Sequence, residues 1–155
     1  MKIIVDGVFF QVRNTGIARV WRSLLKHWST QPFSQCITLL DRGNTAPKFP
    51  SIQSIGIPLY GLASVDEERQ LLQQCCDEVE ADLFVSTYYT TPISTPSIFF
   101  GHDMIPELMG VDLNVPMWQD KHRAISQGIA HVVVSENTKK DLQTLFPKTQ
   151  NEPVT

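Results

Sequence analysis

The 155-residue sequence has only three cysteines, Cys36 and the adjacent pair Cys75 and Cys76. None of them has the CxxC spacing of a metal or redox site, and an odd number leaves one thiol without a disulfide partner. Reduced cysteines are typical of proteins inside the cell. We therefore expect a cytoplasmic protein without structural disulfides.

Long hydrophobic runs are also missing. The first ten residues, MKIIVDGVFF, contain a short apolar run that Asp6 interrupts, and no cleavage-site pattern follows it. Elsewhere no apolar run approaches the length of about 20 residues that crosses a bilayer. The sequence therefore predicts neither a signal peptide nor a transmembrane segment.

Positive charge is in short supply as well, since the formal net charge is -3 at pH 7. Proteins that bind nucleic acids or membrane surfaces usually present broad basic patches, because these gain affinity by releasing counterions. We therefore expect no nucleic-acid partner, and we expect any basic site on this chain to be local.

What the sequence does contain is an alternation of apolar, β-branched runs with amphipathic stretches. Apolar residues three and four positions apart predict helices, and continuous apolar runs predict buried strands. The expected strands span 2–6, 36–40, 52–57, 83–86, 97–100 and 131–135, and the expected helices span 16–30, 65–80, 116–128 and 136–145. This order predicts an α/β fold, a Rossmann-like, doubly wound, mostly parallel sheet with helices on both faces. We expect one domain over residues 1–150 and a polar tail over residues 151–155.

Polar residues follow the first predicted strand, and ligands of such sheets bind beyond the carboxyl ends of the strands. Thr15 is the expected N-cap of the first helix, and Gly16 begins it, where free N–H groups and the helix dipole favour an anion. Arg19 lies in the first turn and is the candidate cation for that anion. A sharp turn also accounts for Gly16. We interpret the neighbouring basic residues as solvated charges, Arg22 and Lys26 on the helix face and Arg13 in the loop before the helix.

A second polar segment, GHDMIPE, follows the strand expected at residues 97–100. Gly101 permits a tight turn and Pro106 fixes the exit of the loop, so His102 and Asp103 are expected at the mouth of the sheet. A histidine beside a carboxylate can exchange protons or bind polar ligand groups. We therefore take His102 and Asp103 as the candidate catalytic residues.

The four histidines can also be purely structural residues. A lone histidine is more often structural than catalytic, and we interpret three of the four in this way: His27, His122 and His131. A zinc site is conceivable from four side chains that lack any recognised ligand spacing: His102, Asp103, Glu107 and His122. We expect neither a metal ion nor a cofactor.

Three segments together resemble a known family: KIIVDG…NTGIARVWRSLL, STYYTTP…PSIFFGHDMIPE and AHVVVSENTKKDL. In this order they are similar to the N-terminal half of retaining glycosyltransferases of the GT-B type, family 4 (group 1). The resemblance extends over nearly the whole chain, and its most specific parts are HDMIPE and SENTKKDL. It implies one of two Rossmann-like domains that face each other across a cleft. In that family the N-terminal domain largely holds the acceptor, and the C-terminal domain binds the sugar nucleotide.

The resemblance also implies roles for individual residues. It places Gly16 in the loop that approaches the donor diphosphate, and it gives His102 a contact with the transferring sugar. Asp103 lies at the same edge. Arg19, chosen above for its place in the first turn of the helix, is the side-chain cation expected beside Gly16. Ser135 and Lys139 correspond to a serine and a basic residue that face the cleft. Tyr88 and Tyr89 are candidates for stacking on a sugar or lipid-linked acceptor, although aromatic residues at a strand end more often serve packing.

We therefore expect the chain to be the acceptor-side half of a glycosyltransferase. The whole enzyme would transfer a sugar from a nucleotide-sugar donor to a glycan, lipid or other acceptor, and this half alone is expected to be inactive. Residues 151–155 fall where the interdomain region of the family begins, and the C-terminal nucleotide-sugar domain is absent from the chain. The bare cleft face then favours self-association. Two alternatives remain. One is a noncatalytic binding or regulatory domain. The other is a small hydrolase or metal enzyme that uses His102 and Asp103, which is disfavoured because the sequence contains no nucleophile-elbow glycine pattern.

Overall fold

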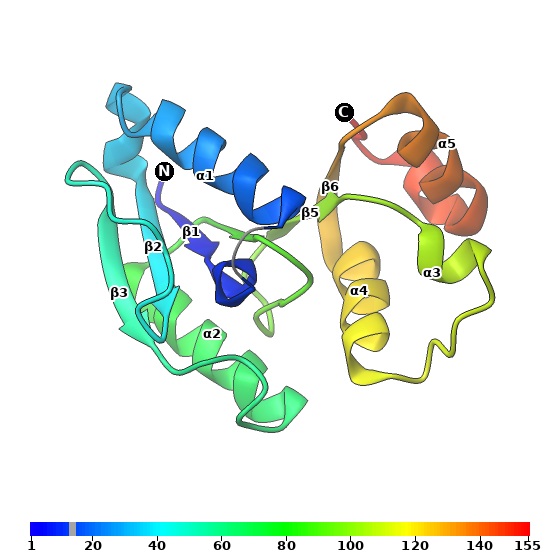
Figure 1. Ribbon diagram of the computed structural model, residues 1–155, viewed down its shortest axis with the longest axis horizontal. Coiled ribbons are helices and arrows are strands. Elements are labelled where there is room, and N and C mark those ends of the chain that lie inside the picture. The colour runs from blue at the N-terminus through cyan, green and yellow to red at the C-terminus, as the bar shows by residue number, and fades with distance from the viewer. Residues whose placement is uncertain (13–14) are drawn as a thin grey trace.

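The computed structural model is built around one sheet of six parallel strands in the order β3-β2-β1-β4-β5-β6 (Figure 1). The structure describes residues 1–12 and 15–155, so Arg13, interpreted above as a loop charge, lies outside the described residues. The strands are β1 (Ile3–Asp6), β2 (Ile37–Arg42), β3 (Gln53–Ile57), β4 (Leu83–Ser86), β5 (Ser97–Gly101) and β6 (Gly128–Val133). The predicted doubly wound α/β fold is confirmed.

Helices cover both faces of the sheet, with α1 on one side and α2 on the other (Figure 1). The α-helices are α1 (Gly16–Trp28), α2 (Val65–Val79), α3 (Ile105–Leu108), α4 (Pro116–Gln127) and α5 (Glu136–Leu145), and the 3₁₀ helices are η1 (Val8–Gln11), η2 (Pro32–Cys36) and η3 (Pro147–Asn151). None of the helices described here combines the length and the apolar character that crossing a membrane requires.

Side chains from successive strand residues enter different cores, as the two-residue period of a strand requires. Ile3 and Val5 pack with Trp21 under α1, whereas Ile4 packs with Leu72 under α2. A third cluster, which includes Tyr89, Phe99, Ala124, Ile125 and Leu142, joins β5 to α4 and α5. Both faces of the central strands are thus buried, which explains their continuous apolar sequences.

A chain of aromatic rings crosses the face under α1. The ring centroids are 5.7 Å apart for Phe33 and Trp28, 6.4 Å for Trp28 and Trp21, and 4.9 Å for Trp21 and Phe100. The ring of His102 follows at 5.1 Å from Phe100. Helix α1 is therefore packed not only on β1 but also on the strand that leads to the candidate histidine.

Two strands differ from their predicted bounds by two residues or more at one end. Strand β2 runs to Arg42 instead of ending at residue 40, because its pairing with β3 continues through Asp41 and Arg42, whose side chains are buried and hydrogen-bonded. Asp41, for example, accepts a hydrogen bond of 2.8 Å from the Ala46 backbone N–H. Strand β6 occupies Gly128–Val133 instead of the expected residues 131–135, and Ser135 caps α5. A local pattern cannot show either change, because both depend on partners elsewhere in the chain.

The last residues of the chain lie along the edge strand β6. The His131 N–H donates to the Pro153 carbonyl at 2.8 Å, and the Thr155 N–H donates to the His131 carbonyl at 3.0 Å. His131 and Val154 form a parallel bridge. Part of the segment predicted as a polar tail is thus joined to the sheet.

We expect Trp21→Ala to lower the free energy of unfolding by about 3–5 kcal/mol, because the side chain is only 1% exposed and its loss leaves a cavity. Its indole nitrogen is buried without a hydrogen-bond partner among the described residues, so Trp21→Phe should cost distinctly less. Urea denaturation measures both changes. Val20→Ala, on the exposed side of α1, is the control, and an equal loss in this variant would contradict the assignment.

Candidate functional site

The carboxyl ends of the parallel strands meet at one edge of the sheet, where ligands of doubly wound proteins bind. Asp6 ends β1, Arg42 ends β2, Ser86 ends β4 and Gly101 ends β5. Asp6 and Ser86 face each other in the register of β1 and β4. The polar residues of the candidate site therefore lie on neighbouring strands.

An ion pair is fully buried at the centre of this edge. Arg42 donates from Nε to Asp6 Oδ1 at 2.8 Å and from Nη2 to Asp6 Oδ2 at 3.0 Å, and both side chains are 0% exposed. Two parallel hydrogen bonds between a guanidinium and a carboxylate fix both the distance and the plane of the pair. The ends of β1 and β2 are consequently held in one relative position.

Two further side chains complete the pair. Arg42 Nη1 donates to Glu68 Oε2 of α2 at 2.9 Å, and the Thr90 hydroxyl donates to Asp6 Oδ2 at 2.6 Å. Burial acts to lower the pKa of Arg42, but the charges and hydrogen bonds of Asp6 and Glu68 outweigh it and raise this pKa above its ordinary value. The guanidinium thus stays charged and joins β1, β2 and α2.

Asp6 and Arg42 are not among the candidates named from the sequence. The signal that could have identified them is a charged residue at the last position of an apolar strand, as in IIVD and ITLLDR. Such a residue is buried only when it is paired. The sequence shows two charges of this kind, but it does not show that they meet.

Tyr60 bridges the loop after β3 to α4. Its hydroxyl donates to Asp120 Oδ2 at 2.6 Å, and its backbone N–H donates to Gln11 Oε1 at 2.7 Å. The Arg42 guanidinium lies 5.5 Å from the centroid of the Tyr60 ring. Burial and the hydrogen bond to Asp120 both raise the pKa of Tyr60. Asp120 also pairs with Arg123, so the bridge ends on a second ion pair.

A hollow of about 160 Å³ opens beside this bridge, at the carboxyl edge of the sheet. Its walls come from η1, from the segment after β4 and from α4. Most of the lining is apolar or aromatic, and a few polar groups interrupt it: Phe9, Gln11, Tyr60, Tyr88, Tyr89, Thr90, Met117 and Asp120 are among its residues. Binding sites for small molecules commonly have this mixture of an apolar surface and few polar groups.

The two tyrosines expected to contact an acceptor both line this hollow, but they differ in burial. Their rings stack with centroids 3.8 Å apart. Tyr89 is only 3% exposed and packs in the core with Phe99, whereas Tyr88 is half-buried. Burial raises the pKa of Tyr88, and the nearby Asp103 charge adds to the rise. Lys121 Nζ, which donates to the Asp103 carbonyl, lies 5.6 Å from the centroid of the Tyr89 ring, so the hollow and the loop that carries Asp103 are close neighbours.

His102 follows β5 and packs its ring on Phe100. The residue before it is Gly101, where a side chain would not fit, because a Cβ at this position would lie 2.7 Å from the Phe99 ring. The Nε2 atom of His102 is buried and has no hydrogen-bond partner among the described residues. Burial lowers the pKa of His102 to about 4; the Asp103 carboxylate opposes this shift, and the positive charge of Lys121 adds to it. At neutral pH the imidazole is uncharged, with one ring nitrogen unused.

A second buried ion pair holds the loop after His102. Lys121 Nζ donates to Glu107 Oε2 at 2.8 Å and to the Asp103 carbonyl at 2.9 Å, with a side chain that is 0% exposed. His122 Nε2 lies 3.0 Å from Glu107 Oε1. Asp103 Oδ1 accepts from the Ile105 N–H at 3.0 Å. Across residues 1–12 and 15–155, no three His, Cys, Asp or Glu side chains are grouped so that they could hold a metal ion.

The other predicted site residues are only partly brought together. The Val134 N–H donates to the Gly101 carbonyl at 3.3 Å, so the segments that carry His102 and Ser135 are adjacent. Ser135 Oγ accepts from the Thr138 N–H at 3.1 Å as the N-cap of α5. Lys139 Nζ donates to the Val154 carbonyl at 3.0 Å. These two residues thus have partners within the chain.

Gly16 and Arg19 lie at the start of α1 and are both exposed. No atom lies within 4 Å of a Cβ built at Gly16, so nothing in the described chain crowds this backbone. Arg19 borders a shallow, mostly apolar hollow along α1 with Val20 and Leu24. The start of α1 is therefore accessible. No partner among the described residues holds the Arg19 guanidinium near His102.

No match to this chain is found among known protein families, curated proteins or solved structures.

We expect Arg42→Met to lower the free energy of unfolding by about 3–5 kcal/mol, because it leaves two buried carboxylates without a counter-charge. Urea denaturation at pH 7 measures the loss. Arg22→Met on the exposed face of α1 serves as the matched control and should change stability by less than about 0.5 kcal/mol. Equal stabilities of the two variants would show that the pair does not organise this edge.

The His102 ring should stay neutral until the pH falls toward its pKa of about 4. This pKa lies below the ordinary value of 6.5, so the unfolded chain binds the proton first and the free energy of unfolding decreases from about pH 6.5 to about pH 4. NMR titration of the ring measures the pKa. His102→Phe should remove this part of the pH dependence, and a ring that titrates near 6.5 would contradict its burial.

Proposed function

We propose that this chain is the acceptor-side half of a glycosyltransferase that transfers a sugar from a nucleotide-sugar donor to a glycan, lipid or other acceptor. The observation that carries the proposal is a neutral, half-buried His102 that lies at the carboxyl edge of a parallel sheet, near a hollow with tyrosine walls. The resemblance of HDMIPE and SENTKKDL to family 4 glycosyltransferases points to the same role.

The hollow suits part of a sugar or of a lipid-linked acceptor. Sugars present apolar C–H faces as well as hydroxyl groups, so they bind where aromatic rings and polar atoms occur together. Tyr88 supplies an aromatic ring with exposed surface, and Gln11 and Asp120 supply polar groups beside it. The hydroxyl groups of an acceptor would therefore find hydrogen-bond partners along one wall.

In this proposal His102 contacts the sugar that is transferred. A neutral imidazole can accept or donate a hydrogen bond without adding charge near the anomeric carbon, where positive charge develops during transfer. The leaving diphosphate develops negative charge, and the exposed start of α1 with Gly16 and Arg19 presents N–H groups and a cation to it. We propose no metal ion or cofactor for this step.

A second folded unit is needed to hold the nucleotide. Several large apolar side chains on the segments at the carboxyl edge are more than half exposed, which is typical of a surface that another unit covers. They are Val12, Ile105, Leu108, Met109 and Val134. We propose that a nucleotide-sugar domain covers this surface and that the chain self-associates there when that domain is absent.

A noncatalytic binding or regulatory domain is the second candidate. Two residues that the resemblance assigns to the cleft favour this candidate. Ser135 and Lys139 already form hydrogen bonds within the chain, to Thr138 and to Val154. We propose the cytoplasm as the compartment of either form, because Cys36, Cys75 and Cys76 are all free thiols.

The binding proposal can be tested with the chain as it is. In ¹⁵N NMR titrations with glucose, galactose, mannose and N-acetylglucosamine, at least one sugar should shift the amide signals of residues 87–90 and 101–107. His102→Phe should weaken this binding about tenfold, the worth of one hydrogen bond. His27→Phe, at an exposed histidine of α1, is the control and should bind as the unaltered chain does.

Two outcomes would contradict the proposal. One is that none of these sugars shifts the two segments at high concentration, because the acceptor side should retain weak sugar affinity alone. The other is binding of UDP or GDP to the isolated chain with a dissociation constant below about 1 µM, or about 8 kcal/mol of binding free energy. Such affinity would place the nucleotide on this domain and not on a second one.

A further inference from the structure

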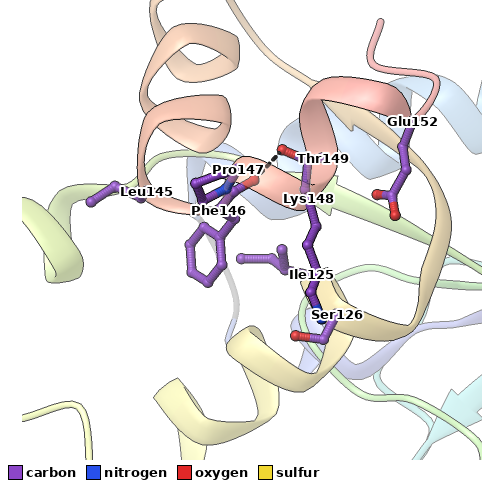
Figure 2. Close-up of a pocket in the computed structure, with 8 residues that line it drawn as sticks. All are labelled: Ile125, Ser126, Leu145, Phe146, Pro147, Lys148, Thr149 and Glu152. Carbon is purple, nitrogen blue, oxygen red and sulfur yellow. Dashed lines mark hydrogen bonds between the residues drawn. The ribbon is translucent and has the colours of Figure 1, made fainter.

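A hollow of about 470 Å³ lies at the opposite edge of the sheet from His102. It is formed where α4 ends before β6 and where α5 is followed by η3 (Figure 2). Its volume falls in the range of about 300–1,000 Å³ that is usual for small-molecule sites. The glycosyltransferase proposal gives this hollow no role.

The inner surface of the hollow is mostly apolar. Ile125 comes from α4, Leu145 from the end of α5, and Phe146 from the residue that follows (Figure 2). Ile125 is 2% exposed and belongs to the core cluster, whereas Leu145 and Phe146 are half-buried around the opening. An aromatic ring or a branched aliphatic group of a ligand would replace water against these three side chains.

The opening carries a cation that forms no ion pair within the described part of the chain. Lys148 extends toward Ser126 across the hollow (Figure 2). Among residues 1–12 and 15–155, the Lys148 ammonium has no salt-bridge partner, and neither this group nor the Ser126 hydroxyl makes a side-chain hydrogen bond. An ammonium beside a hydroxyl can bind a carboxylate with one charge-assisted and one neutral hydrogen bond.

Glu152 sets the direction in which such a ligand would lie. Its carboxylate also lines the hollow, away from the end of the Lys148 side chain (Figure 2). The Oε2 atom of Glu152 lies 3.4 Å from Nδ1 of the buried His131. The Oε2 atom is buried without a hydrogen-bond partner in the described chain. A second anionic group at this end would be repelled. The ligand therefore carries one acid group, placed at Lys148 and Ser126.

We propose that this hollow binds a small amphipathic monocarboxylate, with an aromatic or branched aliphatic body between Ile125 and Phe146 and its carboxylate at Lys148 and Ser126. The proposal rests on the apolar walls, the unpaired cation and the position of Glu152. It is independent of the proposed sugar transfer, because it concerns the other edge of the sheet.

The probes are 2-naphthoate and the neutral 2-naphthamide, which has nearly the same shape. In ¹⁵N NMR titrations, naphthoate should shift the amide signals of residues 125–126 and 145–149 and should bind about fivefold more tightly than naphthamide, as one exposed ion pair allows. Lys148→Gln should abolish this preference. Lys140→Gln, which removes an exposed lysine of α5 outside the hollow, should retain it. Ser126→Phe, at an exposed position of the rim, should block both probes.

Equal affinities of the two probes for the unaltered chain would overturn the carboxylate assignment. The absence of shifts at residues 125–126 and 145–149 with 10 mM naphthoate, on the order of 3 kcal/mol of binding free energy, would overturn the site itself. Retained binding in Ser126→Phe would place the probes elsewhere and would have the same consequence.

Discussion

The Arg42 guanidinium between Asp6 and Glu68 is the interaction on which the carboxyl edge of the sheet depends. Burying three charges is costly unless each is paired, so the ends of β1 and β2 and the first turn of α2 can approach only in this arrangement. The cluster holds two negative charges and one positive charge. An anionic ligand such as a diphosphate is therefore disfavoured at the centre of the edge. The proposed division of labour, with the nucleotide on a second unit, agrees with this electrostatic constraint.

The same constraint shapes the hollow beside it. Tyr60 lies over the guanidinium and reaches Asp120 on α4, so the wall of the hollow is tied to the ion pair at one end and to a second helix at the other. A preorganised wall loses little conformational entropy when a ligand binds. The loop after His102 is fixed in a comparable way by Lys121 and Glu107. Both sides of the candidate site are thus held by buried charges and not by apolar packing alone.

Much of the fold could be predicted because its signals are local. The run KIIVD and the helical spacing of Trp21, Leu24 and Leu25 need no knowledge of distant residues. The position of His102 after an apolar strand could be predicted for the same reason. The pairs that hold the site could not, since Asp6 and Arg42 are 36 positions apart and Lys121 and Glu107 are 14 apart. Their burial depends on which strands and helices become neighbours, which composition and periodicity do not encode.

The aromatic chain that ends at His102 has a spectroscopic consequence. Because the imidazole lies tilted at 44° to the Phe100 ring with centroids 5.1 Å apart, its carbon-bound protons lie in the ring current of a phenyl group. Their resonance positions then depend on the distance between the two rings, and this distance depends in turn on how Trp21 seats α1 against β5. One histidine signal therefore reports on the packing of the first helix, more than 70 residues away in sequence, without any label being introduced.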